Sequence, residues 1–153
     1  MKIAEFLKAE SVISDLSAQT KGDVLKELAG SLGKSNPTVP AARLAAVLEE
    51  REKLGSTGIG EGVAIPHGKL AGLPTLSASF GVSKAGVDFE AIDGKRTHLF
   101  FALVAPENSA GLHLKALARI SRLFKNGSFR DAILAASSSA EIYALIAQED
   151  LKA

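Results

Sequence analysis

The sequence predicts an α/β protein with a single mixed β-sheet flanked by helices on both faces. Apolar residues recur at helical spacing near both ends of the chain, and the middle holds alternating and continuous apolar runs typical of strands. Some of these runs are joined by turns too short for a parallel crossover, so at least part of the sheet is antiparallel. With 153 residues, 46% of them hydrophobic, residues 1–153 are expected to form one domain.

Two helices are expected before the first strand. The first carries apolar residues at a helical period, and the stretch "SLGKSNP" ends it. Those apolar residues are Val24, Leu25, Leu28, Ala29 and Leu32. The second helix is expected to start at Pro40, whose fixed φ suits the first helical position, and to run to about Lys53 before Gly55 stops it.

Three strands are expected in the middle of the chain. "GVAI" (62–65) is short, "TLSASFGVS" (75–83) alternates small polar and apolar residues, and "THLFFALVA" (97–105) is almost continuously apolar. The last pattern is typical of a strand buried on both faces. The stretches "KAG" and "IDGK" provide turns between strands.

Helices are expected again after Pro106. Leu114, Leu117, Ile120 and Phe124 repeat at spacings of three and four, which indicates one helix. The stretch "SSAE" (138–141) fits a capping box that opens a last helix over Ile142, Leu145 and Ile146.

Composition excludes several functional classes. Lys and Arg outnumber Asp and Glu only 18 to 17, so no nucleic acid partner is expected. The absence of cysteine excludes disulfides, a thiolate nucleophile and cysteine-ligated metal. The N-terminus is too charged for a secretory signal and the run Leu99 to Ala105 is too short to span a bilayer, so a cytoplasmic protein without direct membrane insertion is expected.

The stretch "GSTGIGEGVAIPHGKL" (55–70) contains the first candidate site residues. His67 follows a strand and lies between Pro66, which fixes one dihedral, and Gly68, which permits close approach of a ligand or of another backbone segment. In the preceding "GSTGIG", backbone N–H groups and the hydroxyls of Ser56 and Thr57 could donate to an anion. Taken alone, His67 is equally compatible with a loop histidine that binds nothing, and the glycine loop alone is better explained as a turn without ligand.

Two further residues could complete an anion site. His113 follows the turn-like "PENSAGL" at a helix start, where the helix dipole favours an anion, although a solvated helix start explains it as well. Arg51 leads into the glycine loop and could bind the same anion with two hydrogen bonds, or could pair with a surface acid.

Other basic and histidine residues have simpler interpretations. Lys115, Arg119 and Arg122 form either a positive stripe or a solvated helix face. His98 opens the most apolar strand and is interpreted as structural.

A constrained imidazole, an amide-rich loop, a second histidine and an arginine favour phosphoryl transfer through phosphohistidine. Neutral imidazole is a good nucleophile, and the nearly metaphosphate-like group needs mainly positioning and hydrogen-bond donors. Zinc binding is the weaker alternative because only two plausible ligands converge. No metal and no other cofactor is therefore expected.

Residues 48–70, "LEEREKLGSTGIGEGVAIPHGKL", and residues 80–124 resemble the fructose/mannitol-type (type-2) IIA components of the bacterial phosphoenolpyruvate:sugar phosphotransferase system. The paired "IPHG" and "GLHLKALA" segments carry the resemblance. It implies that His67 is the phosphorylated residue and that His113 and Arg51 hold the phosphoryl group. It also implies a mixed sheet, a phosphorylated HPr- or NPr-type carrier as donor, and no metal.

Among the branches of this family, "GSTGIG" and "IPHGKL" most resemble the nitrogen-regulatory IIA proteins (the PtsN type). That resemblance implies a phosphorylation-dependent regulator whose targets would be kinases or potassium transporters. A sugar-transport IIA subunit that passes phosphate to a IIB cysteine is the alternative, because fructose-type IIA domains share "GSTGIG".

Overall fold

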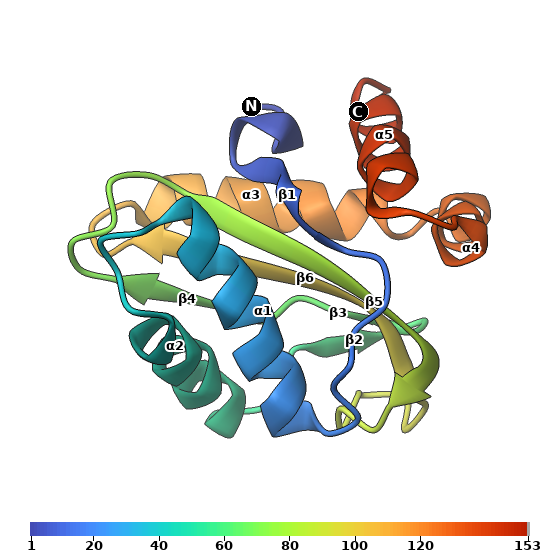
Figure 1. Ribbon diagram of the computed structural model, residues 1–153, viewed down its shortest axis with the longest axis horizontal. Helices are drawn as coiled ribbons and strands as arrows, with labels where there is room; N and C mark the ends of the chain where they lie inside the picture. The colour runs from blue at the N-terminus through green and yellow to red at the C-terminus, as the bar shows by residue number, and fades with distance from the viewer. Residues whose placement is uncertain (153) are drawn as a thin grey trace.

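The computed structural model describes residues 1–152, which form one six-stranded mixed sheet between two layers of helices (Figure 1). A 3-10 turn and six strands make up the first group of elements: η1 (Ile3–Glu5), β1 (Leu7–Ile13), β2 (Gly58–Gly60), β3 (Val63–Ala64), β4 (His67–Leu70), β5 (Ser77–Val87) and β6 (Thr97–Pro106). Five α-helices complete the fold: α1 (Lys21–Ser35), α2 (Ala41–Lys53), α3 (Ala110–Leu123), α4 (Gly127–Ala135) and α5 (Ser139–Asp150).

The sheet has the order β1-β5-β6-β3-β2, and β4 also pairs with β6. β5 and β6 are antiparallel, as are β2 and β3, whereas β1 is parallel to β5 and both β3 and β4 are parallel to β6. The prediction of a mixed sheet is confirmed. No helix within residues 1–152 is long and apolar enough to cross a membrane.

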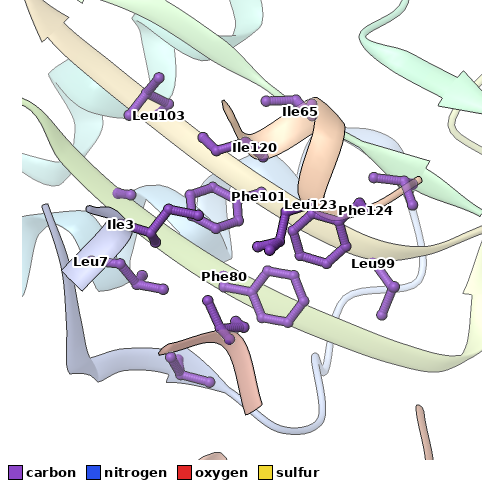
Figure 2. Close-up of a cluster of buried hydrophobic side chains, with 14 of the residues drawn as sticks. Ile3, Leu7, Ile65, Phe80, Leu99, Phe101, Leu103, Ile120, Leu123 and Phe124 are labelled. Carbon is purple, nitrogen blue, oxygen red and sulfur yellow. The ribbon is translucent and has the colours of Figure 1, made fainter. Parts of the chain in front are cut away.

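Strand β6 separates the two hydrophobic cores. Its side chains alternate between them, as the period of two requires. Leu99, Phe101, Leu103 and Ala105 face the core under α3, α4 and α5, which Figure 2 shows in part. Phe100, Ala102 and Val104 face the core under α1 and α2. The prediction that this strand is buried on both faces, with helices covering each, is confirmed.

The four predicted helices are confirmed as α1, α2, α3 and α5. All five apolar residues named for the first helix are buried on α1. The Ser138 hydroxyl accepts a hydrogen bond from the Glu141 N–H at the start of α5. Pro40 is the N-cap of α2 and not its first residue, a difference of one position.

The sequence analysis did not predict the 3-10 turn η1, the strands β1, β2 and β4 or the helix α4, and it expected the residues of β2 and β4 in a loop. β1 lies at the edge of the sheet, so Lys8 and Glu10 are solvent-exposed and interrupt the apolar pattern that would indicate a strand. α4 is short and begins at Asn126, whose side chain accepts hydrogen bonds from the N–H groups of Ser128 and Phe129. An Asn-Gly-Ser stretch is typical of a turn as well as of a helix cap, so the sequence does not distinguish a turn from the start of a short helix here.

Candidate functional site

His67 is positioned by an interruption in the sheet. β3 and β4 both pair with β6, and Pro66 between them lacks an N–H group. The Pro66 carbonyl still accepts a hydrogen bond from the Leu103 N–H at 2.9 Å, which keeps the segment in register. The ring of His67 turns back, and its Nδ1 lies 2.7 Å from the Ile65 carbonyl oxygen. Because a carbonyl only accepts, Nδ1 carries the proton and the Nε2 lone pair is left free.

Gly68 allows α2 to pack directly on the strand that carries His67. A Cβ at this position would clash with the Cγ1 atom of Val47 on α2. The expected close approach at Gly68 is therefore made by a helix side chain. It brings the C-terminal half of α2 alongside β4.

A pocket of about 510 Å³ lies where α2, β4 and the start of α3 meet. In Figure 1, β4 and the start of α3 lie at the same end of the sheet. Both imidazoles line this pocket, together with charged and apolar side chains. The charged residues are Glu50, Arg51 and Lys69, and the apolar ones include Val47, Leu54, Leu114 and Leu117.

The two histidines lie edge to face, with ring centroids 5.4 Å apart and an angle of 74° between the planes. His113 is the fourth residue of α3 and is buried. Its Nε2 atom has no hydrogen-bond partner among the described residues. Buried polar atoms are normally paired, so an unpaired one beside a second imidazole marks this pair of histidines as a candidate site.

Burial keeps both imidazoles neutral at pH 7. It lowers the pKa of His113 to about 4, with further contributions from the charges of His67 and Lys69. Burial also lowers the pKa of His67, and its hydrogen bond to Ile65, which raises the pKa, has the smaller effect. A neutral His67 is the nucleophilic form.

Two cations reach the pocket. The Arg51 guanidinium donates to the Gly55 carbonyl oxygen at 2.9 Å, which holds the side chain close to its own helix end. Lys69 was not recognised as a site residue from the sequence. It lies two residues after His67 on β4, so the two side chains share one side of the strand. That spacing is the signal that could have identified it.

The structure does not bring Ser56 or Thr57 into this pocket. The Ser56 hydroxyl donates to the Phe89 carbonyl oxygen at 2.8 Å and accepts from the Gly58 N–H. The Thr57 hydroxyl donates to Glu52 at 2.5 Å and is buried. Both hydroxyls are used to hold the loop, which corrects their expected role as donors to an anion.

Glu52 anchors the loop between α2 and β2. Its side chain is only 4% exposed, and its carboxylate accepts hydrogen bonds from the N–H and the hydroxyl of Thr57. The same carboxylate pairs with Lys21 of α1 at 3.0 Å. The anchored loop includes Gly55, whose carbonyl holds Arg51, so this buried cluster positions the guanidinium at the pocket.

Replacing Glu52 with Gln is expected to lower the free energy of unfolding by about 1–3 kcal/mol, because it leaves a buried charge network incomplete. Urea denaturation measures this change. Glu90→Gln is the matched control, since Glu90 also pairs with Lys21 but its side chain is 75% exposed. It is expected to cost less than about 1 kcal/mol. Equal losses in the two variants would contradict the role given to Glu52.

The lowered pKa of His113 makes stability depend on pH. Between about pH 6.5 and pH 4 the unfolded chain binds a proton at this residue and the folded chain does not. The free energy of unfolding is therefore expected to fall as the pH falls through this window, and to level off below it. Urea denaturation at several pH values tests this. His113→Gln should flatten the dependence, and an unchanged slope would contradict it.

The remaining predicted residues lie away from the pocket. The Nδ1 atom of His98 lies 3.0 Å from the Ser83 carbonyl oxygen, which agrees with a structural residue satisfied by backbone. Arg119 does not belong to a free positive stripe, because its Nε donates to the buried Asp150 at 2.6 Å. Within residues 1–152, no three His, Cys, Asp or Glu side chains lie close enough together to hold a metal ion.

A mixed sheet with helices on both faces, and a proline-constrained histidine facing a second buried one, define a IIA-type phosphotransferase domain. Residues 5–149 match the family described as "Phosphoenolpyruvate-dependent sugar phosphotransferase system, EIIA 2", and the chain belongs to this family. Its function is thus phosphoryl transfer in the general sense of that system.

Nitrogen regulatory proteins are among its similar relatives. One from Bradyrhizobium diazoefficiens is 37% identical over 96% of this chain and 95% of its own length. The crystal structure of nitrogen regulatory protein IIA-Ntr from Neisseria meningitidis has a TM-score of 0.87 and 36% identity, covering 94% of this chain and 98% of that one. The chain is therefore a phosphotransferase IIA domain with nitrogen regulatory proteins as full-length relatives.

A transport protein is also similar. The fructose-specific EIIABC component of Bacillus subtilis is 37% identical over 98% of this chain, but the match spans only 24% of that larger protein. The mannitol IIA of Escherichia coli shares the fold, with a TM-score of 0.76 at 22% identity.

Proposed function

We propose that this chain is a phosphohistidine phosphocarrier that accepts a phosphoryl group on Nε2 of His67 from an HPr- or NPr-type protein. The observation that carries the proposal is the contact between Nδ1 of His67 and the Ile65 carbonyl, which leaves Nε2 as the free base in the pocket. The ring is fixed before the donor arrives, so little ordering is needed during transfer.

The groups around His67 support this role. Arg51 and Lys69 supply positive charge, and the N-terminal end of α3 adds its dipole beside the pocket. We assign the buried Nε2 of His113 the role of donor to a phosphoryl oxygen, which would give that atom the partner it lacks. Negative charge that spreads over the phosphoryl oxygens in the transition state then meets prearranged donors.

The rim of the pocket suits a protein donor. Leu54 is 84% exposed and Leu114 is 68% exposed, and both line the pocket that holds His67. Leu112, in the first turn of α3, is also exposed. Exposed leucines clustered around a polar centre are typical of a surface that binds another protein transiently.

Within the family, we assign this chain to the nitrogen-regulatory branch, as one domain over residues 1–153 acting in the cytoplasm. Several relatives carry that name, and the solved IIA-Ntr is more similar to this chain in sequence and structure than the mannitol IIA is. Phosphorylation of His67 would place negative charge among exposed leucines and so change the affinity for regulatory targets such as kinases or potassium transporters. The second candidate, a sugar-transport IIA subunit that donates to a IIB cysteine, is favoured by the fructose relative.

The central test supplies the chain with phosphoenolpyruvate, enzyme I and an HPr-type carrier, and maps the phosphate. One phosphate per chain is expected, labile in acid and stable in alkali, as a P–N bond requires. Acid-stable label on Ser56 or Thr57 would contradict the proposal. Omitting the carrier is the control, because enzyme I alone should give no label.

A second assay separates the two biological roles. The phosphorylated chain is mixed with fructose- and mannitol-type IIB domains, and the decay of the label on His67 is followed. Slow decay, together with target binding that depends on phosphorylation, supports the regulator. Rapid transfer to a IIB cysteine supports the transport subunit.

A further inference from the structure

We propose that the same pocket takes a phosphoryl group directly from a small phosphoryl donor, an acyl phosphate or a phosphoramidate, without any carrier protein. This inference rests on the proposed role of His67 as phosphoryl acceptor. It adds an activity in which the substrate is a small molecule.

The first support is that this chain alone supplies the groups that would hold the phosphoryl oxygens. Arg51, Lys69 and His113 all line the pocket, the Nε2 atom of His113 has no partner among the described residues, and none of the three depends on a docked protein. Glu50 lines the same pocket and opposes an anion, but the two cations outweigh its charge. A donor therefore needs to bring only its phosphoryl and leaving groups.

The second support is the size and lining of the pocket. Its volume of about 510 Å³ lies within the range of about 300–1,000 Å³ found for small-molecule sites. A phosphoryl group fills a small part of it. Val47 and Leu117 also line the pocket, so a short acyl chain has apolar surface to contact.

The leaving group defines the class of donor. Nε2 of His67 forms a P–N bond while the P–O bond to the acyl group breaks, and the electron pair leaves with the carboxylate. The Nδ1 proton stays on the ring, held by the Ile65 carbonyl, so no proton has to move. From phosphoramidate, the nitrogen that already carries its protons leaves as ammonia.

Phosphate monoesters such as sugar phosphates are poorer donors by the same reasoning. Their alkoxide would have to be protonated as it leaves, whereas a carboxylate leaves without an added proton. The pocket therefore selects donors whose leaving group is stable without an added proton.

The test incubates the full chain at pH 7 with phosphoramidate or with acetyl phosphate, in the absence of enzyme I and carrier, and follows intact mass and the modified residue. His67 is expected to gain one phosphoryl group at least about tenfold faster than free N-acetylhistidine, which is worth about 1.4 kcal/mol of transition-state binding. Lys69→Ala is expected to slow it by roughly tenfold, as loss of one charge-assisted contact does.

His98 is a matched control within the chain. Its Nδ1 also lies against a backbone carbonyl, that of Ser83, but no second histidine faces it. It should react no faster than N-acetylhistidine, and Lys69→Ala should leave it unchanged. Glucose 6-phosphate should label neither residue.

The outcomes separate this inference from the proposed function. If the carrier protein labels His67 but neither small donor exceeds the N-acetylhistidine rate, this inference is overturned and the phosphocarrier role stands. If His67→Ala takes up label from the small donors as fast as the unchanged chain, the inference is also overturned. A mass gain of acetyl in place of phosphoryl means attack at carbon and overturns it too. If neither carrier nor small donor labels His67, both proposals fail.

Discussion

His67→Ala is expected to abolish phosphoryl uptake from the phosphorylated carrier. The variant lacks the nucleophile, and the other imidazole that lines the pocket, that of His113, has its Nε2 atom buried. His67 is half-buried at the pocket, so its removal leaves the two cores intact. The measurement is the initial rate of acid-labile phosphate incorporation, with circular dichroism confirming the fold.

His98→Ala is the matched control for that prediction. It also removes a half-buried histidine bonded to a backbone carbonyl, and it is expected to keep the labelling rate. One phosphate per chain in His67→Ala would show that another residue is the phosphoryl acceptor. Complete loss of labelling in His98→Ala would show that the labelling rate reflects loss of the fold and not loss of the acceptor.

His113→Ala is expected to leave the nucleophile in place and to slow transfer by about 10²- to 10³-fold, the effect of removing one prearranged transition-state donor. The reason is its place 5.4 Å from the His67 ring, with a buried nitrogen that has no other partner among the described residues. Single-turnover transfer from the carrier measures the rate. Arg51→Ala is expected to act in the same direction, with a smaller loss where water replaces the guanidinium.

The control for His113→Ala is Lys115→Ala, on the same helix but exposed and outside the pocket. It should transfer within about threefold of the unchanged chain, since an exposed charge contributes less than about 1 kcal/mol. If His113→Ala eliminates the label while His67→Ala keeps it, the two histidines have the opposite roles.

The sequence predicted the layers of the fold, and it singled out His67, His113 and Arg51, which the structure brings to one pocket, because both follow from local patterns. The continuous apolar run of β6 indicates a strand that is buried on both faces. Pro66 and Gly68 indicate that the backbone around His67 is constrained. The edge strand β1 was missed because solvent permits charges there. Whether a strand lies at the edge depends on the strand order of the whole sheet, which a local sequence pattern does not predict.

The composition of the glycine loop predicted the hydroxyls of Ser56 and Thr57 as donors to an anion, and the structure has both hydroxyls in contacts within the protein. Ser56 and Thr57 have the chemistry of anion donors, but the loop is folded over a buried carboxylate and a backbone carbonyl that need the same hydrogens. Which acceptor obtains them depends on Glu52, five residues before Thr57 and on another element. Lys69 was missed because a single exposed lysine does not by itself indicate a site. Its relation to the pocket becomes clear only when β4 is placed beside α2.

The hydrogen bond from His67 Nδ1 to the Ile65 carbonyl has a consequence for detecting the modification in cells. Phosphohistidine exists as two isomers, and a ring whose Nδ1 is occupied can be modified only at the other nitrogen, which gives the tele isomer. Antibodies that discriminate tele from pros phosphohistidine should thus recognise this chain with the tele reagent alone. Under the proposed phosphorylation of His67, one backbone carbonyl in the break between β3 and β4 thus determines which of the two antibody reagents detects the modification.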